Sequence, residues 1–115
     1  MTIEFSIVPF FGRQGIKTAS PYEGLGTFLS VSASRSDSWV FATLLPIMEE
    51  LNVRGEPEKY TTDGDYWGVI VTPSTFTIEK RDVDSSPLEP PVSISLADGI
   101  ELIKQWQAHL NRVQA

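Results

Sequence analysis

The sequence carries few residues that could perform covalent or acid–base chemistry. It contains no cysteine, which excludes a thiol nucleophile, a thiolate metal ligand and a disulfide. Its one histidine, His109, falls near the end of an amphipathic segment, where an imidazole is favourable beside a helix C-terminus for structural reasons alone. No serine stands in a nucleophile-elbow sequence that could use His109 as its base. We therefore expect no catalytic residue.

Two short motifs could hold a ligand, and both lack essential parts. The stretch GRQGIKT resembles a phosphate-binding loop, but Ile16 precedes Lys17 at the place where a Walker loop needs a glycine. Asp63 and Asp65 flank a glycine without the further oxygen ligands of a calcium loop. A solvated turn is the alternative for these two aspartates. We expect no metal, no cofactor and no enzymatic activity.

The stretch YTTDGDYWGVIV, residues 60–71, sets acids and aromatics before an apolar run. Residues 69–71 are typical of a buried strand, whereas Tyr66 and Trp67 are neighbours, so that one should point to the core and the other to solvent. An exposed aromatic beside acids has the composition of an interface anchor with a charged rim. The predicted partner-binding residues are Glu56, Glu58, Asp63, Asp65, Tyr66 and Trp67.

The first half of the chain predicts two strands and a helix. Residues 2–9 and 27–33 alternate apolar and polar side chains, as half-buried strands do. Residues 9–26 are rich in glycine and proline, which is typical of a long loop or a loosely paired hairpin. Apolar residues recur at helical spacing over 39–51, with Pro46 inside the pattern. Either one kinked helix spans this segment, which we favour, or 39–44 is extended and a short helix begins at Pro46.

The second half predicts a hairpin followed by a helix. Residues 66–71 and 76–81 are strand-like and flank a turn-forming Thr-Pro-Ser-Thr sequence, and residues 82–91 predict a loop. An apolar stripe at helical spacing runs over 96–112, and Ser95 with Asp98 fits a helix-capping pattern. The order predicts a single α+β domain over 1–115. We expect an antiparallel or mixed sheet of four or more strands, with two helices packed on one face.

Composition and charge disfavour several classes of protein. Nine Lys and Arg against fifteen Asp and Glu give a formal net charge of −6, which argues against a nucleic-acid binder and against binding to an anionic membrane. No apolar run is long enough to span a bilayer and the N-terminus lacks a basic signal-peptide region, so we expect a cytoplasmic protein. Much of the negative charge lies in residues 49–65, which hold Glu49, Glu50, Glu56, Glu58, Asp63 and Asp65. Solubility explains such a segment, and attraction of a basic partner is the sharper interpretation.

The second half of the chain contains, in order, the three stretches DGDYWGVIV, TFTIEKRD and SISLADGIELIKQW. They give an acidic turn, a tryptophan-led hairpin, an acidic loop and a helix opened by a Ser-Leu motif. This series covers about residues 60–110 and resembles the small immunity proteins of bacterial polymorphic toxin systems. The resemblance implies a cytosolic protein that neutralises one toxin by masking its active site or a nearby surface.

We therefore expect a non-catalytic protein-binding module, and an immunity protein that neutralises a basic toxin domain is its most specific form. One alternative is a homo-oligomeric accessory or structural protein, in which the aromatics of residues 9–11 and 66–67 pair with their own copies. The other is a small enzyme or ligand carrier with a pocket beneath the 9–26 loop. Self-association and a foreign protein partner are both open at this point.

Overall fold

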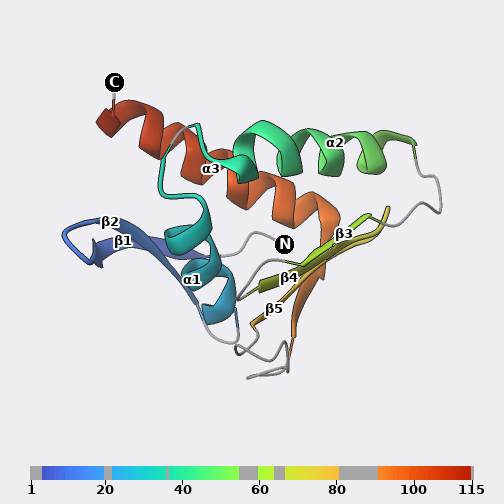
Figure 1. Cartoon of the computed structure of the whole chain (residues 1–115), viewed down its shortest axis with the longest axis horizontal. Coiled ribbons are helices and arrows are strands. Elements are labelled where there is room, and N and C mark those ends of the chain that lie inside the picture. The colour runs from blue at the N-terminus through green and yellow to red at the C-terminus, as the bar shows by residue number, and fades with distance from the viewer. Residues whose placement is uncertain are drawn as a thin grey trace.

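The computed structural model describes residues 4–19, 22–35, 37–54, 60–63, 67–80 and 91–114 of the chain. Within these residues it has an α+β fold, with three helices, a four-stranded antiparallel sheet and a separate two-stranded hairpin (Figure 1). The π-helical segment η1 continues directly into α2. The elements in chain order are β1 (Phe5–Phe10), β2 (Arg13–Thr18), α1 (Glu23–Ser32), η1 (Val40–Leu44), α2 (Leu45–Arg54), β3 (Tyr60–Asp63), β4 (Trp67–Val71), β5 (Thr75–Lys80), β6 (Val92–Ser95) and α3 (Leu96–Gln114).

The prediction of a loop or loosely paired hairpin over residues 9–26 is correct for residues 9–18, which form a hairpin, and wrong for residues 23–26, which begin helix α1. β1 pairs with β2 antiparallel along its whole length. Phe11 and Gly12 form the two-residue turn, with φ angles of 49° and 79°. Pro9 lies inside β1, which tolerates a residue without an N–H group because β1 is an edge strand.

The prediction of a strand over residues 27–33 is wrong, because 27–32 belong to helix α1. The helix buries Leu25, Phe28 and Leu29, which are three and four residues apart, whereas Val31 is exposed. Over so short a segment, the spacing of the apolar residues therefore fits both the alternation of a strand and the periodicity of a helix. Packing of α1 along β2 selects the helix.

Side chains of α1 and β2 hydrogen-bond backbone groups where the helix lies against the strand. Ser30 Oγ accepts the N–H of Ile16 at 2.9 Å and donates to the carbonyl of the same residue at 3.1 Å. Thr18 Oγ1 accepts the N–H of Gly26 at 2.9 Å and donates to the carbonyl of Tyr22. The helix thus satisfies backbone groups at the outer edge of β2, which an isolated hairpin would leave to water.

Gly26→Ala tests this close contact. Alanine normally favours a helix by about 1 kcal/mol relative to glycine. Here a Cβ atom would lie 2.7 Å from the carbonyl oxygen of Ile16 and 2.8 Å from the backbone nitrogen of Thr18, so the helix must move away from the strand. We expect Gly26→Ala to lower the free energy of unfolding by about 1–3 kcal/mol in urea denaturation. Gly24→Ala is the control, because its Cβ would meet only the side chain of Val92, at 3.1 Å. Equal effects of the two substitutions would contradict the prediction.

The segment around Pro46 is helical, so the extended alternative for residues 39–44 is wrong. The N–H of Leu45 bonds to the carbonyl of Val40, five residues earlier, and α2 continues from there to Arg54. Proline lacks an N–H group and its ring crowds the carbonyl four residues before it. The wider π-helical turn directly before Pro46 relieves that crowding without ending the helix.

The four-stranded sheet has the order β3-β4-β5-β6, and all its pairs are antiparallel. The hairpin predicted from residues 66–71 and 76–81 is confirmed as β4 and β5. The sequence pattern did not predict β3 and β6, which have four residues each and are too short to show a clear period of two. The strand predicted over residues 2–9 exists as β1, but it belongs to the separate hairpin.

Helices α1 and α3 contact the same face of this sheet, whereas the helix predicted over 39–51 to pack there forms η1 and α2, and α2 packs on α3 (Figure 1). The register places Trp67 and Val69 of β4 beside Ile78 of β5 on that face. The ring of Phe28 from α1 packs on Trp67. Gly99 of α3 approaches β5 so closely that a Cβ atom there would lie 3.0 Å from the Phe76 ring.

Helix α3 is the predicted C-terminal helix, and its first turn is capped as the sequence indicates. Ser95 Oγ accepts the N–H of Asp98 at 3.1 Å. The helix buries Ile103, Trp106 and Leu110 at 1% exposure or less. None of the helices in the described part of the chain is long and apolar enough to cross a membrane.

Candidate functional site

Two of the six predicted partner-binding residues lie in the described part of the chain, at the end of β3 and the start of β4. Asp63 ends β3 opposite Gly68, and Trp67 begins β4. The remaining four, Glu56, Glu58, Asp65 and Tyr66, lie outside the described residues. The acids that precede them on α2 are each paired with a base, Glu49 with Lys104 and Glu50 with Arg54, both at 2.9 Å.

Trp67 faces the core. Its side chain is half-buried, and its ring meets the Phe28 ring edge-on, with 5.5 Å between centroids and 71° between planes. A side chain in this position adds to the packing of α1 on the sheet. Trp67 is therefore not an exposed anchor, and the predicted alternative, Tyr66, lies outside the described residues.

His109 ties the hairpin to α3. Its ring stacks on Trp106, with centroids 5.6 Å apart and planes 16° apart. Its Nε2 atom hydrogen-bonds to the side-chain oxygen of Gln14 on β2. These contacts are those of a structural residue, and no carboxylate is among them.

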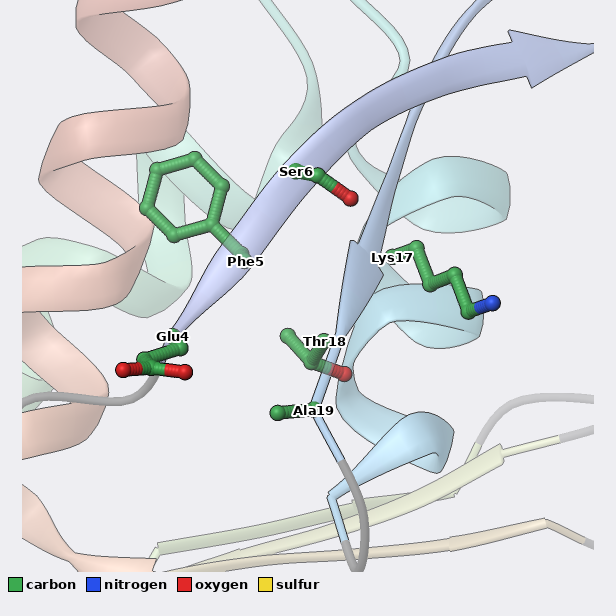
Figure 2. A pocket seen from close by; sticks show the side chains of 6 residues that line it. All are labelled: Glu4, Phe5, Ser6, Lys17, Thr18 and Ala19. Atoms are coloured by element: carbon green, nitrogen blue, oxygen red, sulfur yellow. The ribbon is translucent and has the colours of Figure 1, made fainter.

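A hollow of about 290 Å³ lies where β1 begins and β2 ends. Figure 2 shows the side chains that line it. The Glu4 carboxylate and the Lys17 ammonium group lie on opposite sides of the view and do not converge. The hydroxyl of Thr18 is occupied by its bonds to α1. Among the residues that line this hollow, no two groups are arranged as an acid and a base around a shared point. The lining residues are Glu4, Phe5, Ser6, Lys17, Thr18 and Ala19.

The turn of the first hairpin exposes an aromatic cluster, which we call the hairpin tip (Phe10, Phe11, Gly12 and Arg13). Phe11 is 89% exposed, although it is one of the largest apolar side chains. The Phe10 ring meets it edge-on at a centroid distance of 4.8 Å. The guanidinium carbon of Arg13 lies 5.4 Å from the Phe10 centroid, in cation–π contact.

A second hollow lies beside the hairpin tip, where β2, the segment after α1 and the end of α3 meet. It has a volume of about 370 Å³, and its walls carry the side chains of Arg13 and Arg35. No group of three or more histidine, cysteine, aspartate or glutamate residues in the described ranges could hold a metal ion.

No family model matches the chain, and neither a curated protein nor a solved structure is similar to it at a significant level. The resemblance of residues 60–110 to immunity proteins therefore stays a prediction.

Proposed function

We propose that the protein is a non-catalytic protein-binding module and that the hairpin tip is its anchor. The observation that carries the proposal is Phe11, which combines 89% exposure with a φ angle of 49°. Positive φ at both central residues is the feature of a type I′ turn, where Asn, Asp or Gly is usual at the first position. A phenylalanine at this position lowers the free energy of unfolding by about 1 kcal/mol, and its ring is exposed to water.

Contact with a partner explains why this position holds an aromatic residue. Aromatic and arginine side chains are enriched in the cores of protein interfaces. The hairpin tip presents Phe11 outward, with Phe10 and Arg13 packed behind it. The tip therefore has the composition of an interface hot spot, with one ring free to enter a pocket of the partner.

Neutralisation of a basic toxin domain is the second candidate, and it uses a different surface, which we call the acidic end. The structure describes the last turn of α2 and β3 (Tyr60–Asp63) of this surface, and Glu56, Glu58 and Asp65 are assigned to it from the sequence alone. Val53, in that last turn, is 83% exposed and could contribute apolar contact. The net charge of −6 would attract a basic protein over a distance set by the ionic strength.

The two surfaces can be separated experimentally because they lie far apart. In Figure 1 the turn between β1 and β2 is at one end of the longest axis, and the end of α2 is near the other. The Cα atoms of the molecule extend 39 Å along that axis. A small partner domain that covers one surface would leave the other exposed.

Site-specific photo-cross-linking in the native host tests the proposal. A cross-linking amino acid replaces Phe11, Val53 or Thr27, and the last of these is the control because it is exposed on α1, away from both surfaces. We expect position 11 to capture a protein, either a second copy or a foreign one, in clear excess over position 27. Equal capture at 11 and 27 would refute the tip as an anchor. Capture of a basic toxin domain at 53, with protection of cells that express the toxin, would establish the second candidate.

Charge reversal tests the acidic end separately. We expect Asp63→Lys with Asp65→Lys to slow association with a basic toxin domain about tenfold at low salt, since rim charges act mainly on the association rate. The effect should shrink as salt rises, because screening shortens the range of attraction. Stopped-flow association at two ionic strengths measures it. Glu23→Lys with Glu101→Lys is the matched control, which makes the same change in net charge on exposed positions of α1 and α3. An association rate that falls equally in both double variants would leave no role for the acidic end.

A further inference from the structure

The hollow beside the hairpin tip combines an apolar side with a cationic side. Its volume of about 370 Å³ is within the range of small-molecule sites, near the lower limit. Leu110 is 1% exposed and Val113 is 47% exposed, so α3 supplies apolar surface that is partly open to a ligand. The remaining lining residues are Arg13, Gln14, Ser34 and Arg35.

Arg13 is held in place. Its Nη2 atom donates to the Ser30 carbonyl at 3.3 Å, and its guanidinium lies over the Phe10 ring. The bond to Ser30 takes one of the five N–H donors of a guanidinium group. A fixed guanidinium with further donors can bind an anion without a large loss of side-chain entropy.

Among the described residues, the side chain of Arg35 is paired with an exposed neighbour, Asp37. Its Nε atom lies 3.5 Å from Asp37 Oδ1, and the two side chains are 76% and 78% exposed. Pairs of this kind contribute little to stability, because water solvates both groups. A ligand carboxylate can therefore replace Asp37 at small cost.

We propose that this hollow binds a small carboxylate with a short apolar tail, a function beyond protein binding. Two guanidinium groups line it, and the Asp37 carboxylate balances one of them until a ligand carboxylate replaces it. The ends of α1 and α3 contribute about half a negative charge each. The carboxylate would lie between Arg13 and Arg35, and the tail would cover Leu110 and Val113. An alcohol would leave the guanidinium groups without an ionic partner, and acetate would leave the apolar side in contact with water.

Trp106 provides a reporter for this site. Its indole N–H donates to the carbonyl of Ala33 at 2.8 Å, and Ala33 precedes the lining residue Ser34. Leu110 is one turn further along the same helix. The indole signals of Trp39 and Trp67 serve as internal references, because neither residue lines the hollow.

Octanoate is the probe, and the nuclear magnetic resonance signals of the three indole N–H groups are the readout. We expect a saturable shift of the Trp106 signal with octanoate, and a much smaller one with octanol or acetate at equal concentration. Arg35→Gln should weaken octanoate binding about tenfold, the loss of one charge-assisted hydrogen bond. Arg13→Gln should do the same. Lys17→Gln is the control, since it removes an equal charge from an exposed position of β2 outside this hollow.

Three results would overturn the proposal. The first is a Trp106 signal that does not shift with octanoate. The second is an equal shift of all three indole signals, which would indicate non-specific adsorption. The third is unchanged octanoate affinity in Arg35→Gln, a variant whose exposed side chain leaves folding intact. The arginines would then serve only to neutralise the end of α1. None of these results bears on the hairpin tip, so failure here is distinct from failure of the protein-binding proposal.

Discussion

Replacing Trp106 by alanine should lower the free energy of unfolding by about 3–5 kcal/mol, the range for deletion of a large aromatic side chain from a core. The side chain is 0% exposed and its indole N–H donates to the Ala33 carbonyl at 2.8 Å. Its ring also supports His109, which binds β2. Because a domain of this size has a total stability of about 5–15 kcal/mol, the variant should be close to unfolding.

Guanidinium denaturation followed by circular dichroism measures this loss without relying on tryptophan fluorescence. Trp39→Ala is the control, because that side chain is 40% exposed and should lose much less. Trp106→Phe separates the contribution of packing from that of the hydrogen bond. This variant keeps an aromatic ring in the core but leaves the Ala33 carbonyl without its donor, which costs about 1–3 kcal/mol. If Trp39→Ala were as damaging as Trp106→Ala, the assignment of Trp106 as the central core residue would be wrong.

The elements that the sequence predicted correctly have signals within one contiguous segment. Helix α3 combines a long apolar stripe with a cap at Ser95, and the β4–β5 hairpin combines two alternating runs with a turn sequence. These signals depend on the backbone and on nearby residues, so no distant contact is needed to interpret them.

The elements that the sequence missed depend on residues far along the chain. Helix α1 is helical where it packs on β2, and Ser30 and Gly26 contribute through contacts with Ile16 and Thr18. β6 is a strand because it pairs with β5 across residues 81–91. Four residues carry too little pattern to predict such pairing.

In the candidate surfaces, too, some features are visible in the sequence and others depend on contacts between distant residues. The acid-rich composition of residues 49–65 is visible in the sequence, whereas the inward position of Trp67 depends on Phe28 of α1. Phe10 and Phe11 are conspicuous in the sequence as apolar residues in a glycine-rich segment. The positive φ of Phe11 could not be predicted, because Phe-Gly is not a usual sequence for this turn.

Phe11→Gly should separate binding from folding. The substitution removes the exposed ring, so affinity for a partner that contacts residue 11 should fall by at least about 2 kcal/mol, or roughly thirtyfold. Glycine adopts a positive φ freely, which gains about 1 kcal/mol, while loss of the edge contact with Phe10 costs about 0.5–1.5 kcal/mol. These effects largely cancel, and the free energy of unfolding should stay within about 1 kcal/mol of the original.

The affinity measurement depends on what position 11 captures. For a second copy, light scattering over a range of concentrations gives the dissociation constant of the dimer, and Phe11→Gly should make the protein monomeric. For a foreign protein, calorimetry with the purified partner gives the affinity directly. Val53→Ser is the matched control, because it removes an apolar side chain that is 83% exposed at the other end of the molecule.

The opposite behaviour of Trp106→Ala makes the comparison decisive. That substitution should destabilise the fold, whereas Phe11→Gly should leave the fold intact and lose the partner. If Phe11→Gly instead unfolds the domain, the ring at position 11 is a structural residue despite its exposure, and the strain in the turn has a folding role. If both stability and affinity are unchanged, Phe11 is a tolerated surface residue and the hairpin tip is not an interface. Loss of affinity in Val53→Ser alone would move the interface to the acidic end, where a basic partner is expected.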